Sequence, residues 1–247
     1  MKKEAYRQHF ELEDRFWWFL GRRKAIKNLL ASFPNGEKRS EANRLSILDA
    51  GCGTGGMFQL LETFGNVWGC DLSQEALHYC QKRGQTGHLI RGSVLSLPFP
   101  EKQFDIVVAC DLISHRSIED DAKALKELYR VCKKDGCLLL TDSAFDCLWS
   151  GHDRFFHGVR RYTVATLKPV IMERGFSIKR ISYMNMILFP LMYLWRKLRR
   201  HGNSSDLKPI PSPLNQCLAW LFMGEAQLLK YYNLPFGSSI ICLAKKP

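Results

Sequence analysis

The sequence lacks closely spaced cysteines. Its nine cysteines are scattered and form no C-x-x-C pair, so neither a structural zinc site nor a disulfide framework is expected. Several of them fall in predicted strands or helices, where cysteine behaves as a small buried hydrophobic residue. The pattern is typical of a protein kept in a reducing cytosol.

Acidic residues are also scarce, and the first residues do not form the apolar core of a signal peptide. Asp and Glu total 24 against 36 Lys and Arg, which leaves a net charge of +12. A positive charge of this size suits a nucleic acid, an anionic membrane surface or an anionic substrate. After Met1-Lys2-Lys3 the chain continues with polar residues, unlike a secretory signal. We therefore expect a cytoplasmic protein.

What the chain does contain is the composition of an ordinary globular protein. Hydrophobic residues make up 46% and charged residues 24% of its 247 residues, which excludes a disordered chain. The length suits one α/β domain with additions.

Residues 47–56 combine the end of a strand, a glycine turn and the start of a helix. Ile47 and Leu48 end an apolar strand, four glycines follow, and apolar residues at helical spacing begin at Met57. Glycine accepts positive φ and lets a ligand approach the backbone, and free N–H groups at a helix start can bind that ligand. The stretch predicts a ligand site; the alternative is a tight turn without a ligand.

The motif itself leaves the ligand open. Gly51, Gly53 and Gly56 satisfy the dinucleotide pattern G-x-G-x-x-G. Asp49-x-Gly51-x-Gly53-x-Gly55 also fits the form found in class I S-adenosylmethionine (SAM) methyltransferases. A carboxylate at the strand end suits a cationic amino-acid ligand and would repel a pyrophosphate. NAD and SAM are both candidates at this point.

Strands and helices alternate after the turn. Asp71 ends the next strand, 22 residues after Asp49, where a βαβ unit places the acidic residue that binds ribose hydroxyls. Ser73 is positioned to cap the following helix. The alternation predicts a parallel, doubly wound sheet. Further strands are expected at 88–91, 104–110 and 137–141, and helices at 74–83 and 118–132.

These stretches resemble a known family. Over residues 45–183 the chain is similar to class I SAM-dependent methyltransferases of the ubiquinone/menaquinone-biosynthesis type (methyltransferase types 11 and 12). The resemblance implies SAM as the cofactor and S-adenosylhomocysteine as its product. The matching stretches are 47–56, 70–73, 92–94 with 97–99, 104–115 and 125–140.

The resemblance also implies roles in cofactor binding. The loop from Gly51 through Cys52 and Gly53 to Gly55 would pass under the methionine part of SAM, and Asp49 would hold its ammonium. Further residues implied are Asp71 at the ribose hydroxyls, Leu72 against the adenine, Ser93 at the adenine amino group in place of the usual acidic residue, Val94 as a backbone donor to the ring, and Asp111 and His115 in the loop after the fourth strand.

Residues 1–33 are expected to form two helical segments, the second at 22–33. An aromatic cluster at 16–19 precedes the second segment and is flanked by arginines. Either these rings pack the segment on the domain, or they form a lid over the cofactor or acceptor. A polar linker is expected at 34–44. The candidate lid residues are Trp17, Trp18 and Arg22.

The loop at 149–163 follows the fifth strand and would face the acceptor in this fold. Methyl transfer to oxygen or to an acidic carbon requires a base, and imidazole has a suitable pKa. His152 and His157 are therefore the candidate catalytic residues, with Asp153 to orient them; the alternative is a basic loop with structural histidines. A metal is not expected, because no third ligand has suitable spacing. Arg160, Arg161 and Tyr162 are candidate substrate contacts.

The last pair of strands is interrupted. The sixth strand is expected at 176–183 and an antiparallel seventh at 238–244. The predicted fold is α/β: a Rossmann-like, seven-stranded, mostly parallel sheet with helices on both faces and an antiparallel last strand. Its parts are an N-terminal helical lid and linker (1–44), a SAM-binding core (45–183), a helical insertion (184–237), which begins with the candidate substrate residue Asn185, and the last core strand (238–247).

The insertion combines apolar and basic segments. Its uncharged run 184–195 is too short to span a bilayer and contains Pro190. A basic cluster at 196–200 follows, which suits an interfacial helix in peripheral contact with anionic lipid at the inner face of a membrane. Alternatively, this segment and 217–229 cap the site and pack internally. Either arrangement would make an apolar acceptor pocket.

The leading hypothesis is SAM-dependent methyl transfer to oxygen or carbon of a small, apolar or lipid-linked acceptor. The net charge motivates an RNA methyltransferase as an alternative, but Asn/Asp-Pro-Pro-Tyr and Pro-Cys motifs are lacking. An NAD-dependent dehydrogenase ranks third. A non-catalytic SAM-binding or membrane-associated protein is motivated by Ser93 and by Ser114, which replaces the glutamate of the family's Leu-Glu-His signature.

Overall fold

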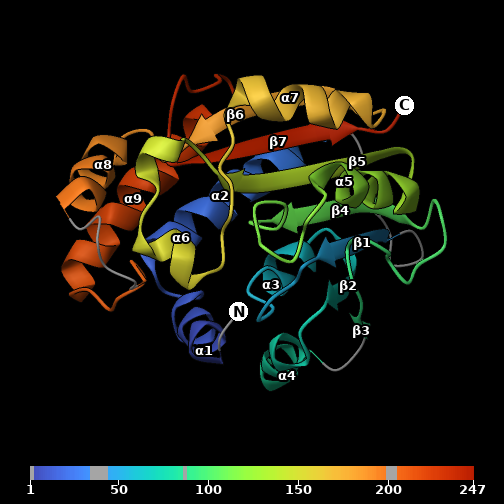
Figure 1. The fold of residues 1–247 in the computed structure, drawn as a ribbon, viewed down its shortest axis with the longest axis horizontal. Coiled ribbons are helices and arrows are strands. Elements are labelled where there is room, and N and C mark those ends of the chain that lie inside the picture. The colour runs from blue at the N-terminus through green and yellow to red at the C-terminus, as the bar shows by residue number, and fades with distance from the viewer. Residues whose placement is uncertain (1–2, 34–43, 86–87, 199–204) are drawn as a thin grey trace.

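A computed structural model describes residues 3–33, 44–85, 88–198 and 205–247. In these residues seven strands form one sheet in the order β3-β2-β1-β4-β5-β7-β6 (Figure 1). The predicted linker at 34–44 lies, apart from its last residue, outside the described residues. The strands are β1 (Leu45–Ala50), β2 (Gly65–Asp71), β3 (Leu89–Arg91), β4 (Phe104–Cys110), β5 (Cys132–Ser143), β6 (Ser177–Met184) and β7 (Ser239–Lys245).

The strand directions confirm the predicted fold class. β1 to β5 are joined by parallel pairings, and β7 lies antiparallel between β5 and β6. β1 is central, because Ile47 pairs with Val67 on one side and with Ile106 on the other. Residues 106–109 of β4 are fully buried, as expected for a parallel strand covered on both faces.

β5 is longer than the predicted strand at 137–141. It begins at Cys132, which pairs with Phe104, and then shifts register so that Cys137 pairs with Ile106. Asp135, with φ of +62°, and Gly136 form an irregularity within the strand instead of the turn before it. Asp135 and Gly136 do interrupt the strand pattern, but residues of the neighbouring β4 pair with β5 on both sides of the interruption.

Capping side chains decide where the core helices begin. The Ser73 hydroxyl accepts from the Ala76 N–H at the start of α4 (Gln74–Lys82), as predicted. α5 (Asp121–Val131) begins three residues later than predicted, because the Asp120 carboxylate caps it by accepting from the Lys123 N–H. The other core helices are α3 (Phe58–Leu61), α6 (Gly151–Phe155) and α7 (Val164–Glu173), with a 3-10 turn, η2 (Asp146–Leu148).

Two further pairs of helices come from the N-terminal segment and the insertion. They are α1 (Lys3–Leu12) and α2 (Trp17–Ala31), and α8 (Phe189–Leu198) and α9 (Ser212–Leu228). None of the described helices is both long enough and apolar enough to cross a bilayer. Figure 1 shows α8 and α9 together at one end of the molecule, on the left, with β3 and α4 at the lower edge.

α2 and α9 pack against each other along their lengths. The Asn215 side chain accepts from the Trp17 N–H at 2.9 Å and donates to the Arg15 carbonyl at 2.7 Å. Asn28 donates to the Ala226 carbonyl at 2.6 Å. α2 therefore begins at Trp17 and not at the predicted Arg22, because its N-terminal cap comes from a helix about 200 residues away in the chain.

The α2–α9 interface leaves no room for a side chain at Gly21. A Cβ there would lie 2.0 Å from the Phe222 ring. We expect Gly21→Ala to lower the free energy of unfolding by about 1–3 kcal/mol through overpacking, measured by urea unfolding. Gly224→Ala is the matched control, because its Cβ meets no described atom within 4 Å; it should raise stability by up to about 1 kcal/mol. Equal stabilisation by both variants would contradict this packing.

Candidate active site

One large cavity lies at the carboxyl ends of the parallel strands, where open α/β sheets bind ligands. Its volume is about 850 Å³, and its walls come from the glycine turn, the N-terminal helices, α6 and the insertion. Sixteen of the predicted site residues line it: Asp49, Gly51, Cys52, Gly53, Asp71, Leu72, Ser93, Val94, Asp111, His115, Trp17, Trp18, Arg22, His152, Asp153 and Arg161.

The glycine turn presents bare backbone to the cavity. Gly51 and Gly53 have φ of +73° and +55°, a conformation that favours glycine. A Cβ on Gly53 would meet no described atom within 4 Å, so the space beside it is open. Gly55 instead lies against Cys80, whose Sγ would be 3.1 Å from a Cβ, and it is not among the described residues that line the cavity.

Asp71 joins the glycine turn to the start of α4. Its two carboxylate oxygens accept from the Gly53 N–H at 3.0 Å and the Ser73 N–H at 2.8 Å. Burial raises its pKa, while these two hydrogen bonds oppose the shift. Each oxygen retains a second lone pair, so the carboxylate can still accept from two ligand hydroxyls.

Opposite charges meet at the base of the turn. Asp49 is buried, and its Oδ2 has no hydrogen-bond partner among the described residues. Burial raises its pKa to about 7, against the lowering effect of Arg22. Arg22 reaches this point from α2: it pairs with Asp111 and lies 4.6 Å from the centre of the Trp18 ring.

These groups fit the amino-acid part of SAM. The unpaired Asp49 oxygen suits the ammonium, and the buried Arg22 Nε, also without a partner among the described residues, suits the carboxylate. Gly53 leaves space for the chain between them, and Asp71 offers acceptors for the ribose. A dinucleotide would instead place its pyrophosphate beside the Asp49 carboxylate, which repels it.

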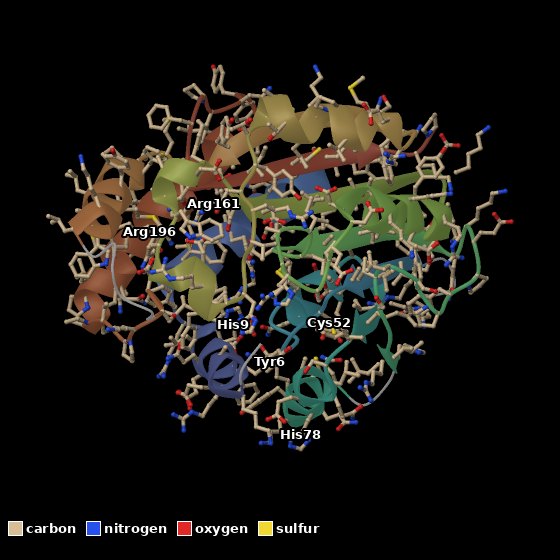
Figure 2. All side chains as sticks on the ribbon, in the orientation of Figure 1. Tyr6, His9, Cys52, His78, Arg161 and Arg196 are labelled. Atoms are coloured by element: carbon tan, nitrogen blue, oxygen red, sulfur yellow. The ribbon has the colours of Figure 1, made fainter. Side chains whose placement is uncertain are left out.

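Glu13 is a site residue that the sequence reasoning missed. It lies on the cavity wall and pairs with Arg83 at 3.2 Å and with the Thr54 hydroxyl. Burial would raise its pKa, but hydrogen bonds from His9 and Thr54 and the charges of His9 and Arg83 lower it to about 2. Figure 2 shows His9 on α1, to the left of Cys52 in the glycine turn. No local motif marks Glu13, since its partners are distant in the sequence.

His115 is held as a neutral hydrogen-bond donor. Its Nδ1 accepts from the Ser117 N–H at 3.1 Å, so the ring proton must be on Nε2. That Nε2 is buried and has no partner among the described residues. Burial is the main cause that lowers the pKa of His115 to about 4, and the ring stays neutral at physiological pH.

His152 is held in the same way. Its Nδ1 accepts from the Asp206 N–H at 3.2 Å, and burial lowers its pKa to about 3. Asp153, the predicted orienting group, accepts from the Ser150 N–H at 2.8 Å and pairs with Arg161 at 2.7 Å. The group that orients His152 is therefore the insertion backbone, and the ring is poised to donate a proton in a hydrogen bond, not to accept one.

Four more predicted residues are not among those that line the cavity in the described chain: His157, Arg160, Tyr162 and Asn185. The His157 ring stacks 6.0 Å from that of His115. Arg160 and Tyr162 both contact Asp121, at 3.4 Å and 2.8 Å. Asn185 is buried and donates to the Ser238 hydroxyl at 2.8 Å. These side chains position loops beside the cavity.

The insertion provides the far wall of the cavity. Arg196 of α8 is buried, pairs with Asp206 at 2.8 Å and donates to the Leu148 carbonyl at 2.9 Å. Figure 2 shows Arg196 and Arg161 in the upper left of the view, away from His78 on α4 at the lower edge. The apolar side chains that line this part are Leu191, Met192, Trp195, Leu207, Ile210, Leu214 and Leu218.

Known proteins match the chain most clearly over its core. A model described as a methyltransferase domain matches residues 48–140. A malonyl-[acyl-carrier protein] O-methyltransferase from Enterobacter lignolyticus is 30% identical over 58% of this chain and 51% of its own length. A demethylmenaquinone methyltransferase from Chlorobaculum tepidum is 30% identical over 52% of this chain and 49% of its own length. The matched part thus spans about half of these relatives.

Solved structures extend the likeness to the whole fold. A SAM-dependent methyltransferase from Archaeoglobus fulgidus superposes with a TM-score of 0.58, covering 96% of this chain and 99% of its own. Its sequence identity is 17%, so the likeness establishes the fold.

The buried carboxyl of Asp49 gives a test of the cofactor cradle. With a pKa of about 7, this carboxyl is neutral below that pH and must lose its proton to pair with an ammonium. We expect the dissociation constant of S-adenosylhomocysteine, measured by calorimetry, to rise towards tenfold per pH unit as the pH falls from 7 to 5.5.

Asp49→Asn is the matched variant. The variant should bind S-adenosylhomocysteine more weakly, and its dissociation constant should depend little on pH over this range. It retains Asp142, the other carboxyl whose pKa burial raises to about 7. An unchanged pH slope in the variant would remove Asp49 from the cradle.

The strand order, the unpaired Asp49 oxygen beside the glycine turn and the matches to known proteins agree on one family. Residues 48–140 form a SAM-dependent methyltransferase domain with the class I fold around it and SAM as its cofactor, and this domain is similar to those of the ubiquinone/menaquinone-biosynthesis type.

Proposed function

We propose that the chain transfers the methyl group of SAM to an oxygen or acidic carbon of a small, apolar or lipid-linked acceptor that binds in its ionised form. The observation that carries this proposal is the pair of neutral histidines, His115 and His152, on the wall of a chamber whose far side is apolar. An apolar chamber accommodates the body of the acceptor, and an imidazole N–H stabilises an anionic reacting group.

The chain's own residues mainly bind and position the reactants. When bound, SAM supplies an electrophilic methyl group on a positively charged sulfur. Asp49 and Arg22 hold the amino-acid end, and Asp71 holds the ribose, so that the direction of the methyl group is fixed. His115 offers its Nε2–H to the acceptor oxygen. Because neither His115 nor His152 has a free basic nitrogen in this arrangement, the acceptor loses its proton to solvent before it reacts.

The relatives are consistent with an acceptor of this type. One is named for O-methylation of malonyl-[acyl-carrier protein] and another for methylation of demethylmenaquinone. A different relative, from Arabidopsis thaliana, is named as a tRNA methyltransferase and is 34% identical over 38% of this chain. An RNA acceptor is therefore the alternative that a test must include.

An acceptor panel with pH profiles tests the proposal. Alkyl carboxylic acids, alkyl phenols and total tRNA are incubated with saturating SAM, and release of S-adenosylhomocysteine is measured. We expect transfer to an apolar acid or phenol, with an acidic limb of kcat/KM that moves with the pKa of the acceptor. Transfer to tRNA alone would contradict the proposal. If the acidic limb of kcat/KM instead lay near the usual pKa of histidine for every acceptor, a histidine would be the base that removes the proton of the acceptor.

The His115 donor makes a second prediction. His115→Leu should lower kcat about 100-fold, as loss of one donor to a developing or full anion does, with little change in S-adenosylhomocysteine affinity. His115→Gln, which can place an N–H near the same point, should retain most of the rate. His78→Leu is the control: His78 is exposed on α4 and lies at the lower edge of Figure 2. Equal losses in the Leu and Gln variants would exclude a donor role.

A further inference from the structure

The insertion exposes most of the large hydrophobic side chains on the described surface. Of those exposed in the described residues, all but Leu72, Val159 and Met172 lie between residues 187 and 236. On α8 and just before it, Ile187, Leu191, Leu194 and Leu198 follow one another at spacings of four, three and four, which places them on one helix face. The exposed fraction of Leu198 reaches 85%.

α9 is apolar on both of its faces. Its inner face, with Phe222 and Ala226, is buried against α2. Its outer face carries Leu214 and Leu221 with Trp220, which is 69% exposed. The helix contains a single charged residue, the buried Glu225. A helix that is apolar all round is normally buried all round, so the outer face of α9 requires a cover.

The charges around this surface have one sign. The exposed charged residues of the insertion, within its described part, are Lys197, Lys208 and Lys230. The insertion sequence, 184–237, holds six Lys and Arg but two acidic residues. Both acidic groups are occupied: Asp206 pairs with Arg196 at 2.8 Å, and Glu225 accepts from the Ile187 N–H at 2.8 Å.

Aromatic residues complete the surface. Trp195 is 47% exposed, Trp220 is 69% exposed and Tyr231 is 74% exposed. Trp and Tyr favour the boundary between lipid and water, where apolar rings and polar tips are both satisfied. An apolar face with aromatic side chains, basic neighbours and no exposed acid is the composition of a surface that enters the headgroup region of an anionic bilayer. A second copy of the chain would oppose lysines to lysines.

This surface is continuous with the cavity. Leu191, Trp195 and Leu214 are each about half exposed, at 60%, 47% and 51%, and each also lines the cavity. The cavity wall and the apolar surface of α8 and α9 therefore share these three side chains. An acceptor that resides in a bilayer could enter the cavity along them without crossing water.

We propose that the outer faces of α8 and α9 dock on an anionic lipid bilayer, and that the acceptor enters the cavity from that bilayer. The docking stands on the exposed residues alone, while the entry of the acceptor rests on the proposed function. Coulombic attraction brings the basic surface to the lipid, and burial of the leucines and tryptophans then holds it there. The side chains that the surface shares with the cavity wall face the lipid in this orientation.

Vesicle sedimentation tests the docking. The full chain is mixed with vesicles of phosphatidylcholine, or of phosphatidylcholine with phosphatidylglycerol. We expect binding to the anionic vesicles, at least tenfold weaker binding to the neutral ones, and weakening at 0.5 M salt through screening. Trp220→Ser with Leu221→Ser should lower the partition coefficient at least tenfold.

Met172→Ser is the matched control, because Met172 is 50% exposed but lies on α7. It should bind vesicles like the parent chain. Trp220 and Leu221 are not among the described residues that line the cavity, so the double variant should keep its unfolding midpoint and its affinity for S-adenosylhomocysteine. Those two measurements exclude misfolding as the cause of lost binding.

Two outcomes would overturn the docking. One is the absence of binding to anionic vesicles. The other is a dimer in analytical ultracentrifugation that the Trp220/Leu221 variant converts to monomer, since a second copy would then be the cover. The proposed function can fail separately from the docking. Vesicle binding without methyl transfer to any acceptor would contradict the proposed function. Methyl transfer to a water-soluble acceptor without vesicle binding would contradict only the docking.

Discussion

The buried guanidinium of Arg22 is the interaction on which the cofactor site depends. A buried charge is stable only when it is paired, and Arg22 meets Asp111 and the field of Asp49 at the ends of two central strands. Arg22 is carried by α2, and α2 is fixed by the side chains of α9. Both segments outside the sheet are therefore needed to balance the charges at its edge.

The same arrangement separates the two halves of the reaction. The core that matches known methyltransferases, residues 48–140, supplies the glycine turn, Asp49 and Asp71. The proposed acceptor half comes from α6, the loop after it and the insertion, which contribute His152, Arg161, Arg196 and the apolar wall. His152 joins the two, because its protonation state is fixed by a backbone N–H of the insertion.

The parts of the fold that were predictable are those in which short-range pattern and tertiary structure agree. β4 has its predicted bounds, because a continuous apolar run is stable only when buried on both faces. The predictions differ from the structure where a distant partner intervenes. α2 begins early because Asn215 caps it, and β5 is long because Phe104 pairs beyond the Asp135-Gly136 break. Asp153 binds Arg161 instead of a histidine.

Periodicity and turn chemistry act over a few residues, so the amino-acid pattern alone predicts the sheet, the place of the glycine turn and the carboxylates at two strand ends. The groups that complete the site, by contrast, are brought together by contacts between distant segments. Glu13 beside Thr54, Arg22 beside Asp49 and the Asp206 N–H on His152 join residues that are far apart in the chain. Burial at these contacts, which no local sequence pattern indicates, shifts the pKa of each group and so decides whether the group is charged.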